Sequence, residues 1–384
     1  MRMSRQLPSP EDLKPRWLHT VRDLVEWLDD LSPGEPVAVD SEFERTHTFY
    51  ARPGLVQLAT DRDACLVEPS VAEGCEAFRA FLSNPRQTKL LYAMSEDLDL
   101  FREWLRVEPA GVLDLQLGVA LAGEGLSKGF ARVMEAHFDI TLDKALTRSD
   151  WLARPLSAAQ ERYALADVYY LLPLHEQLMR TLEVCGLLDA LVEESETFAR
   201  EQLLQQREID DYYLRLRGGW KLGPQQQQIL RRLCIWREHL CRSLDRPRSR
   251  VVADKLLLAI ADTLPRTLTS LGGIDGMPPV VVRKHGGVIL EVIEEELATP
   301  DADIALIEAP LSRDEQACYR NVKSALEKLL QGMPVPPELL APRRKLEPGV
   351  REGLRDGGVP AFLREGWRGK LLADHIRQLE TYFQ

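Results

Sequence analysis

The sequence of 384 residues has few cysteines and no long apolar run. Its six cysteines lie far apart, without a C-x-x-C pair and without histidines beside them, which argues against a zinc site and against a disulfide framework. No stretch approaches the roughly 20 apolar residues that a membrane-spanning helix needs. The first residues, MRMSRQLPSPEDLK, lack the apolar core of a secretory signal. We therefore expect a cytoplasmic protein without a membrane association.

The chain also lacks the excess of positive charge that is typical of nucleic-acid-binding proteins, since its formal net charge is -11. Residues 1–190 carry 20 Lys and Arg against 31 Asp and Glu, whereas residues 191–384 carry 29 of each kind. All of the excess acid therefore lies in the first half. Such a half can still handle phosphates if some carboxylates hold divalent cations, because the ion then inverts the local field.

The first half is predicted to form a mixed sheet flanked by helices. Runs of branched apolar residues indicate strands, and short connections between the first three favour an antiparallel meander. The predicted strands are residues 36–43, 54–60, 64–69, 89–94 and 111–116. Apolar residues at three- and four-residue spacing predict the helices. These are residues 71–84, 95–106 and 157–186, the last of them kinked or interrupted by Pro173.

Strand signals fade after about residue 190, and helical patterns replace them. We predict a helical connector and then two small all-α domains, separated by an acidic linker rich in Pro and Ala. The predicted division is a first domain at 1–190, a connector at 191–213, a second domain at 214–297, a linker at 298–312 and a third domain at 313–384.

Four carboxylates of the first half form a candidate site. Asp40 and Glu42 stand at alternate positions late in a predicted strand, so their side chains point to the same face. Asp97 lies in the first turn of a helix after a strand, and Asp167 follows Tyr163 by four residues on one helix face. Carboxylates gathered at one end of a sheet would bind two divalent cations through oxygen ligands. Two such ions can activate a water and stabilise the leaving oxygen of a phosphodiester.

Most of these residues also have a structural interpretation. Asp97 can stabilise the dipole of its helix, Asp167 can be satisfied by an arginine, and a tyrosine such as Tyr163 is more often packed than catalytic. The pair of Asp40 and Glu42 is harder to explain in this way. Two neighbouring carboxylates at the end of a buried strand repel each other and resist desolvation.

Taken together, these residues resemble the three motifs of the DEDD superfamily of 3′→5′ exonucleases. The motifs are VDSEFER at 39–45, LLYAMSEDLDLF at 90–101 and ERYALADVYYLLPL at 161–174. The Tyr163-x-x-x-Asp167 form resembles the tyrosine subclass, and residues 129–174 as a whole resemble the ribonuclease D family. The second domain resembles the HRDC module through the stretch that starts with GGWKLG at residue 218, and the third does so through FLREGWRGKLL.

The resemblance implies a ribonuclease H-like α/β catalytic domain followed by two all-α HRDC-type domains. It implies a 3′→5′ exoribonuclease that trims 3′ extensions of tRNA precursors and other small structured RNAs and releases 5′-nucleotides. Asp40, Glu42, Asp97 and Asp167 would hold two divalent cations, Mg²⁺ or Mn²⁺, and Tyr163 would orient the attacking water. We expect a monomer.

Two other functions are compatible with parts of the sequence. A DNA 3′→5′ exonuclease of the proofreading type would use the same carboxylates, but the HRDC-like domains favour the ribonuclease. A non-catalytic nucleic-acid-binding protein built on HRDC modules would not need the complete set of five residues.

Several further residues are candidates for substrate binding. Tyr92 stands where the family usually has histidine, and we expect activity to survive this change with an altered rate or preference. Lys144 and Arg148 could hold the scissile phosphate, and His47 and Phe49, just past the first motif, could border the groove for the terminal nucleotides.

Positive charge is concentrated between residues 230 and 255, where eight Lys and Arg face three acids. We predict that four of these arginines contact RNA phosphates, and the alternative is a solvated helix face. The four are Arg231, Arg232, Arg237 and Arg242.

Overall fold

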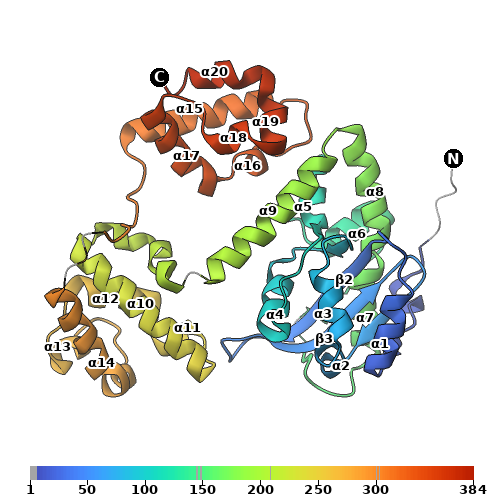
Figure 1. Cartoon of the computed structure of the whole chain (residues 1–384), viewed down its shortest axis with the longest axis horizontal. Helices are drawn as coiled ribbons and strands as arrows, with labels where there is room; N and C mark the ends of the chain where they lie inside the picture. Colours follow the sequence, from blue (N-terminus) through green and yellow to red (C-terminus); the bar gives the residue numbers. More distant parts are fainter. Residues whose placement is uncertain (1–6, 144–145, 148, 208, 300, 302) are drawn as a thin grey trace. The chain divides into compact units, whose positions relative to one another are not determined.

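The computed structural model describes the chain except residues 1–6, 144–145, 148, 208, 300 and 302. The chain divides into two compact units (Figure 1). The first unit contains residues 1–44, 52–202 and 311–384, and the second contains residues 45–51 and 203–310. Within the described residues, no helix combines the length and the apolar character that crossing a membrane requires.

A six-stranded mixed sheet forms the centre of the first unit. Its strand order is β1–β4–β3–β2–β5–β6, in which β3 is antiparallel to β2 and to β4 and the other pairings are parallel. The strands are β1 Arg16–Leu18, β2 Val37–Glu44, β3 Arg52–Ala59, β4 Ala64–Val67, β5 Lys89–Leu91 and β6 Val112–Asp114. The predicted mixed sheet and its antiparallel meander are confirmed, and the short edge strand β1 is an addition.

Helices complete the first half of the chain. They are η1 Pro10–Asp12, α1 Val21–Asp29, α2 Pro69–Glu73, α3 Glu76–Ser83, α4 Ser95–Leu105, α5 Leu115–Val119, the π-helical turn η2 Ala120–Glu124, α6 Phe130–Phe138, α7 Ala158–Tyr169, α8 Leu171–Val184 and α9 Leu188–Arg207. Ser157 caps α7 through a reciprocal pair of hydrogen bonds with Gln160. The interruption expected from Pro173 falls between α7 and α8, because a proline ring clashes with the carbonyl four residues earlier, here that of Tyr169.

Side chains of β2 alternate between two apolar cores, one on each face of the sheet. Val37 and Val39 pack with residues of α1 and α3, whereas Ala38 packs with residues of α7. The same alternation directs Asp40 and Glu42 to the face that α7 covers.

The second unit is helical. Its elements are η4 Ile209–Arg215, η5 Arg217–Lys221, α10 Pro224–Leu244, α11 Arg248–Val251, α12 Asp254–Thr263, α13 Leu268–Gly272 and α14 Pro279–Ala298. Residues 45–51, which connect β2 to β3, pack here rather than with the sheet. Phe49 belongs to the apolar core of this unit, and the backbone N–H groups of Phe49 and Tyr50 both donate to the Asp245 carboxylate, at 2.9 and 3.0 Å.

The C-terminal helices belong to the first unit. They are α15 Arg313–Leu329, α16 Pro337–Leu340, α17 Arg343–Asp356, α18 Ala361–Arg364, α19 Gly366–Leu372, η6 Ala373–His375 and α20 Ile376–Glu380. Their buried residues form one core with residues at the end of α8 and the start of α9, among them Leu182 and Leu191. This C-terminal block is therefore fixed to the first unit by a shared core.

Ion pairs reinforce the contact between α9 and the C-terminal block. The buried Glu194 accepts hydrogen bonds from the Arg368 guanidinium and from the Trp367 indole, the latter at 2.7 Å. The remaining nitrogens of Arg368 donate to the carbonyls of Leu340 and Leu339, at 2.7 and 2.9 Å. The buried guanidinium is thus paired and hydrogen-bonded, as a buried charge must be.

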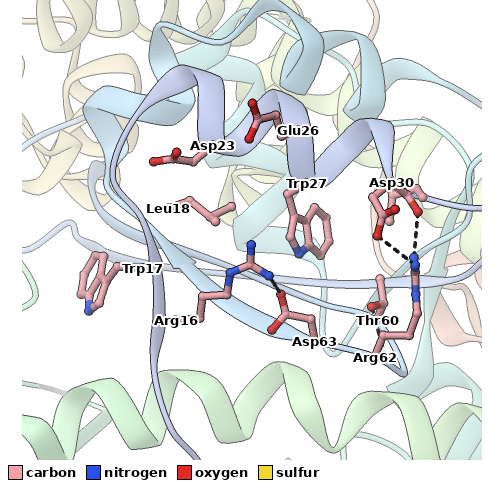
Figure 2. A pocket seen from close by; sticks show the side chains of 11 residues that line it. Arg16, Trp17, Leu18, Asp23, Glu26, Trp27, Asp30, Thr60, Arg62 and Asp63 are labelled. Carbon is pink, nitrogen blue, oxygen red and sulfur yellow. Dashed lines mark hydrogen bonds and ion pairs between the residues drawn. The ribbon is translucent and has the colours of Figure 1, made fainter.

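A charged hollow of about 490 Å³ lies at the edge of the sheet beside β1 (Figure 2). Arg16 pairs there with Asp63, and Arg62 donates to the carboxylate of Asp30 at 2.9 Å and to that of Glu35 at 3.0 Å. The arginines thus tie the edge strand and the end of α1 to the β3–β4 turn, so the charges of this hollow serve the fold.

We predict that Glu194→Ala lowers the free energy of unfolding by about 3–5 kcal/mol, because it leaves the buried guanidinium of Arg368 unpaired. Chemical denaturation of the purified protein measures this change. The matched control is Asp189→Ala, on the same helix as Glu194, which breaks an exposed pair with Lys370 of α19 and should leave stability close to that of wild type. Equal stabilities of the two variants would contradict the assigned role of Glu194.

Candidate active site

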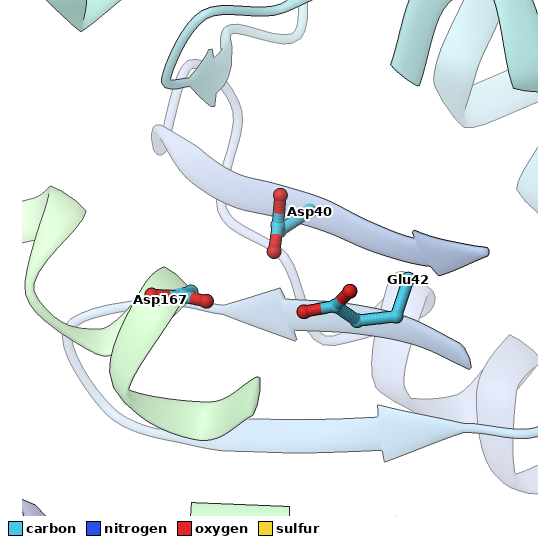
Figure 3. A group of neighbouring side chains, drawn as sticks. All are labelled: Asp40, Glu42 and Asp167. Atoms are coloured by element: carbon cyan, nitrogen blue, oxygen red, sulfur yellow. The ribbon is translucent and has the colours of Figure 1, made fainter. Parts of the chain in front are cut away.

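Three carboxylates converge between β2 and α7 (Figure 3). One oxygen atom each of Asp40, Glu42 and Asp167 lies within 4.8 Å of the other two, and all three side chains are half-buried. Asp40 and Glu42 reach this point from alternate positions of β2, and Asp167 reaches it from the last turns of α7. The sheet and one helix therefore bring together residues that are far apart in the chain.

Asp97 approaches the same strand from α4 and lies outside this group of three. It is the third residue of α4, is buried, and accepts a hydrogen bond from the Ser41 hydroxyl. Ser41 stands between Asp40 and Glu42, so its side chain points to the other face of β2. The structure thus holds Asp97 against the strand that carries the first two acids.

Tyr163 lies one helical turn before Asp167 on α7. Its hydroxyl is 3.3 Å from the hydroxyl of Thr147, and it lies close enough to the Asp167 carboxylate for each group to affect the pKa of the other. The tyrosine ring packs against the buried ring of Trp151, at 6.0 Å between centroids. The packing against Trp151 and the contact with Thr147 therefore fix the direction of the phenol.

Burial raises the pKa of each carboxyl of the site, and repulsion from neighbouring acids adds to the effect at Asp40, Glu42 and Asp97. Burial and the charge of Asp167 raise the pKa of Asp40 well above its usual value, and burial with three neighbouring acids raises the pKa of Glu42 to about 10. Burial and Asp40 likewise raise the pKa of Asp97. Burial raises the pKa of Asp167 to about 7 against the opposing hydrogen bond from Tyr163. Without a cation, the site thus resists carrying four negative charges.

This donor set fits divalent cations. Hard cations such as Mg²⁺ and Mn²⁺ prefer carboxylate oxygens, and a bound cation would remove the repulsion that raises these pKa values. Gln57 lies directly opposite Asp40 on β3 and is fully buried. Neither its amide oxygen nor its amide nitrogen has a hydrogen-bond partner among the residues that the structure describes. Because opposite residues of paired strands face the same side, this orphaned amide adds an unsatisfied polar group beside Asp40.

The residues predicted to bind substrate differ in exposure and in their contacts. Tyr92 donates a hydrogen bond to the carbonyl of Lys128, and its ring packs against Phe130 at 5.0 Å, so it has a structural role here. His47 is exposed on the β2–β3 connection. Phe49 is buried in the second unit, and the guanidinium groups of Arg242 and Arg248 each lie 5.0 Å from its ring centre. Lys144 and Arg148 lie outside the described residues.

The four arginines predicted to contact RNA lie on α10 and differ in exposure. Arg232 is exposed, and Arg231 is partly exposed. Arg242 is partly buried and lies over the ring of Phe49. Arg237 is completely buried and donates to the Asp254 carboxylate at 2.6 Å and to the Val252 carbonyl at 2.9 Å. The prediction that Arg237 contacts RNA phosphates is wrong, because a guanidinium enclosed in this way presents no surface to RNA.

Two residues near the site were not predicted as part of it. The Ser41 hydroxyl donates a hydrogen bond to the Asp97 carboxylate, and the Thr147 hydroxyl forms a hydrogen bond with the Tyr163 hydroxyl. The signal for Ser41 was present in the sequence, since the residue between two same-face acids must face the other way. Thr147 gave no signal, because it lies in an irregular segment whose course depends on the tertiary structure.

Comparison with known proteins agrees with this architecture. The family model for 3′→5′ exonucleases matches residues 15–183, and the HRDC domain model matches residues 226–293. Ribonuclease D of Pseudomonas paraeruginosa is 32% identical over 356 residues, which cover 92% of this chain and 94% of that protein. Ribonuclease D of Escherichia coli is 32% identical over 354 residues, which cover 89% and 92%.

A comparison with solved structures supports the same family. The crystal structure of E. coli RNase D superimposes with a TM-score of 0.85 at 29% identity, covering 97% of this chain and all of that one. The fold, the acidic cluster and the family model together define a 3′→5′ exonuclease. Within this class, the chain belongs to the ribonuclease D family and is an exoribonuclease, a hydrolase of phosphodiester bonds in RNA.

We predict that the metal-free protein loses stability as the pH rises. An unfolded Asp has a pKa of about 4, whereas folded Asp167 has a pKa of about 7 and folded Glu42 one of about 10. The folded state therefore binds more protons above pH 4, so its stability decreases as the pH rises through 7 and towards 10. In EDTA, Asp167→Asn should raise the melting temperature by a few degrees at pH 8 and by less at pH 5.

Thermal unfolding in EDTA at the two pH values measures this difference, and Mn²⁺ should stabilise wild type more than the variant. Asp356→Asn is the control, because Asp356 is exposed and Arg355 lowers its pKa, so no gain at pH 8 is expected. A melting temperature of Asp167→Asn that follows wild type at both pH values would contradict the raised pKa.

Proposed function

We propose that Asp40, Glu42, Asp97 and Asp167 bind two divalent cations, Mg²⁺ or Mn²⁺, and that this exoribonuclease removes 5′-nucleotides one at a time from RNA 3′ ends. The observation that carries the proposal is the convergence of three carboxylates from β2 and α7 within 4.8 Å, with raised pKa values. Such a cluster is unfavourable in a protein unless a cation compensates it.

Within this proposal, the bound cations supply a nucleophile at neutral pH and stabilise the charge that develops on the leaving oxygen. Asp40 would be the central member of this ligand set, because it belongs to the group of three and its charge also raises the pKa of Glu42 and of Asp97. The four carboxyls must lose their protons before they bind cations, so cation affinity increases with pH.

Tyr163 orients the attacking water in this proposal. Burial and the neighbouring Asp167 raise the pKa of its phenol, so the hydroxyl stays neutral and can donate or accept a hydrogen bond. The contact with Thr147 and the packing against Trp151 limit its rotation, which favours one direction of that hydrogen bond.

The proposed substrates are 3′-extended precursors of tRNA and other small structured RNAs. The relative of known structure from E. coli is described as an exoribonuclease involved in structured RNA processing, which supports this choice. The exposed Arg232 and the partly exposed Arg231 and Arg242 remain proposed phosphate contacts of the HRDC unit, and His47 remains a proposed neighbour of the RNA.

The organisation of the chain is part of the proposal. We retain a catalytic domain at 1–190, an HRDC domain at 214–297 and a second HRDC-like domain at 313–384, joined by the connector at 191–213 and the linker at 298–312. A monomer acting in the cytoplasm completes the proposal.

We predict that Asp40→Asn lowers the rate of RNA shortening by at least about 10³-fold, because the proposed cation site loses one of its charged ligands. The assay uses a 5′-labelled hairpin RNA with a short 3′ extension in Mg²⁺, Mn²⁺ or EDTA, beside a DNA of the same sequence. Glu44→Gln, on the same strand but outside the group of three carboxylates, is the matched control and should remain active. Metal-independent cleavage, or equal trimming of DNA, would refute the proposal.

We predict that Tyr163→Phe lowers kcat by about 10²-fold and leaves the KM for RNA nearly unchanged. Phenylalanine keeps the packing against Trp151 and removes only the hydroxyl that faces Asp167 and Thr147. Single-turnover cleavage at saturating RNA measures the effect, with Thr147→Val as a variant of intermediate rate. A kcat equal to that of wild type would exclude the hydroxyl from the reaction.

A further inference from the structure

Asp114 connects two elements beside the proposed cation ligands. It is the last residue of β6, is buried, and its carboxylate accepts three backbone N–H groups. The donors are Ala93 at 2.9 Å, Met94 at 3.2 Å and Gln116 at 2.9 Å. The bond to Gln116 caps α5, the helix that Asp114 itself begins, but the bonds to Ala93 and Met94 reach across to a different part of the chain.

Ala93 and Met94 form the turn between β5 and α4. Ala93 has a φ of +59°, a left-handed conformation that an alanine adopts at a cost. Met94 occupies the N-cap position of α4 and offers no side-chain cap. Asp114 therefore supplies, from the neighbouring strand, the acceptor that holds this turn in its strained form.

The position of Asp97 depends on this turn. Asp97 is the third residue of α4, so its Cα is fixed once the turn and the first hydrogen bonds of the helix are fixed. The first such bond runs from the Leu98 N–H to the Met94 carbonyl at 3.0 Å. A relaxed Ala93 would shift the start of α4 and with it the carboxylate that meets Ser41 on β2.

Helix α9 contacts Asp114 through a backbone hydrogen bond. The backbone N–H of Asp114 donates to the hydroxyl of Ser195, which is fully buried on α9, at 3.0 Å. Ala199 of the same helix packs in one apolar cluster with Met94 and Leu98. The turn thus lies between β6 and α9 and is bound to both.

We propose that Asp114 is a positioning residue of this exoribonuclease, which fixes Asp97 for cation binding through the backbone of Ala93 and Met94, with Ser195 as its support. This inference rests on the proposed function, because it takes Asp97 as a cation ligand. Asp114 itself touches neither cation nor substrate, so it acts only through the geometry of α4.

The test uses the full-length variants Asp114→Asn and Ser195→Ala. Asparagine offers one acceptor oxygen where the carboxylate offers two, so at least one N–H of the turn loses its partner. Calorimetric titration with Mn²⁺ and the Mn²⁺ dependence of single-turnover RNA cleavage are measured well below the melting temperature. We expect the Mn²⁺ dissociation constant to increase about tenfold or more for Asp114→Asn and by less for Ser195→Ala, with the KM for RNA unchanged.

Lys89→Met is the matched control for a merely structural effect. Lys89 lies at the other end of β5, is buried, and donates to the carbonyls of Asn84, Gln87 and Ala110 at 2.6, 2.9 and 2.6 Å. Its loss should lower the melting temperature without changing the affinity for Mn²⁺. If Asp114→Asn fails to fold, Ser195→Ala carries the test.

The outcomes separate the two proposals. Variants that bind Mn²⁺ and cleave as wild type does, at whatever stability, would overturn the positioning role and leave the proposed function intact. The positioning role would also be overturned, and the proposed function left intact, if Lys89→Met weakened Mn²⁺ binding as much as Asp114→Asn does. Wild-type protein that neither binds Mn²⁺ nor shortens RNA would overturn the proposed function and the positioning role together.

Discussion

Electrostatic repulsion among the half-buried carboxylates is the constraint that the rest of the first unit has to satisfy. Two unit charges separated by 4.8 Å repel each other by on the order of 3 kcal/mol at an effective dielectric constant of about 20. Asp40, Glu42 and Asp167 make three such pairs, and burial adds to the cost by raising every pKa of the group. Without a cation, bound protons relieve part of this repulsion, as the raised pKa values show, and the surrounding structure keeps the side chains together.

The sheet and the helices around it form this surrounding structure. β2 carries two of the acids and pairs with β3 from Ala38 to Glu44, and its first residues, Val37 and Ala38, also pair with β5. The apolar residues that precede the acids on β2 are fully buried in the two cores, which fixes the register of the strand. The acids can therefore repel each other without moving the strand that bears them.

Helix α9 joins this framework to the C-terminal helices. Glu194 binds Arg368 of the C-terminal block, whereas the next residue, Ser195, binds Asp114 beside the proposed active site. Consecutive residues of a helix point in different directions, so one helix can serve both contacts. The C-terminal block thus stabilises the element that also supports the start of α4. The second unit, by contrast, contains the connection from β2 to β3. There the Asp245 carboxylate accepts a hydrogen bond from the backbone N–H of Phe49.

The sequence by itself determined the elements whose signals are local. Alternation of apolar and acidic residues predicted β2 and the shared face of Asp40 and Glu42, and the four-residue spacing predicted that Tyr163 and Asp167 share a face of α7. Such patterns are readable because the periods of strands and helices are fixed by backbone geometry. The motifs of the first half likewise indicated the family, because each of them is a short continuous stretch of the chain.

Tertiary structure decided what local patterns leave open. The three residues of β1 are too few for a period, so that strand exists only because β4 offers it hydrogen-bonding partners. Arg237 looked like a surface cation, but an acid 17 residues away in the chain pairs with it in the interior. The contacts of Asp114 with Ala93 and Ser195 span 21 and 81 residues. No sequence period encodes such distances, because only the packing of strands and helices sets which residues meet.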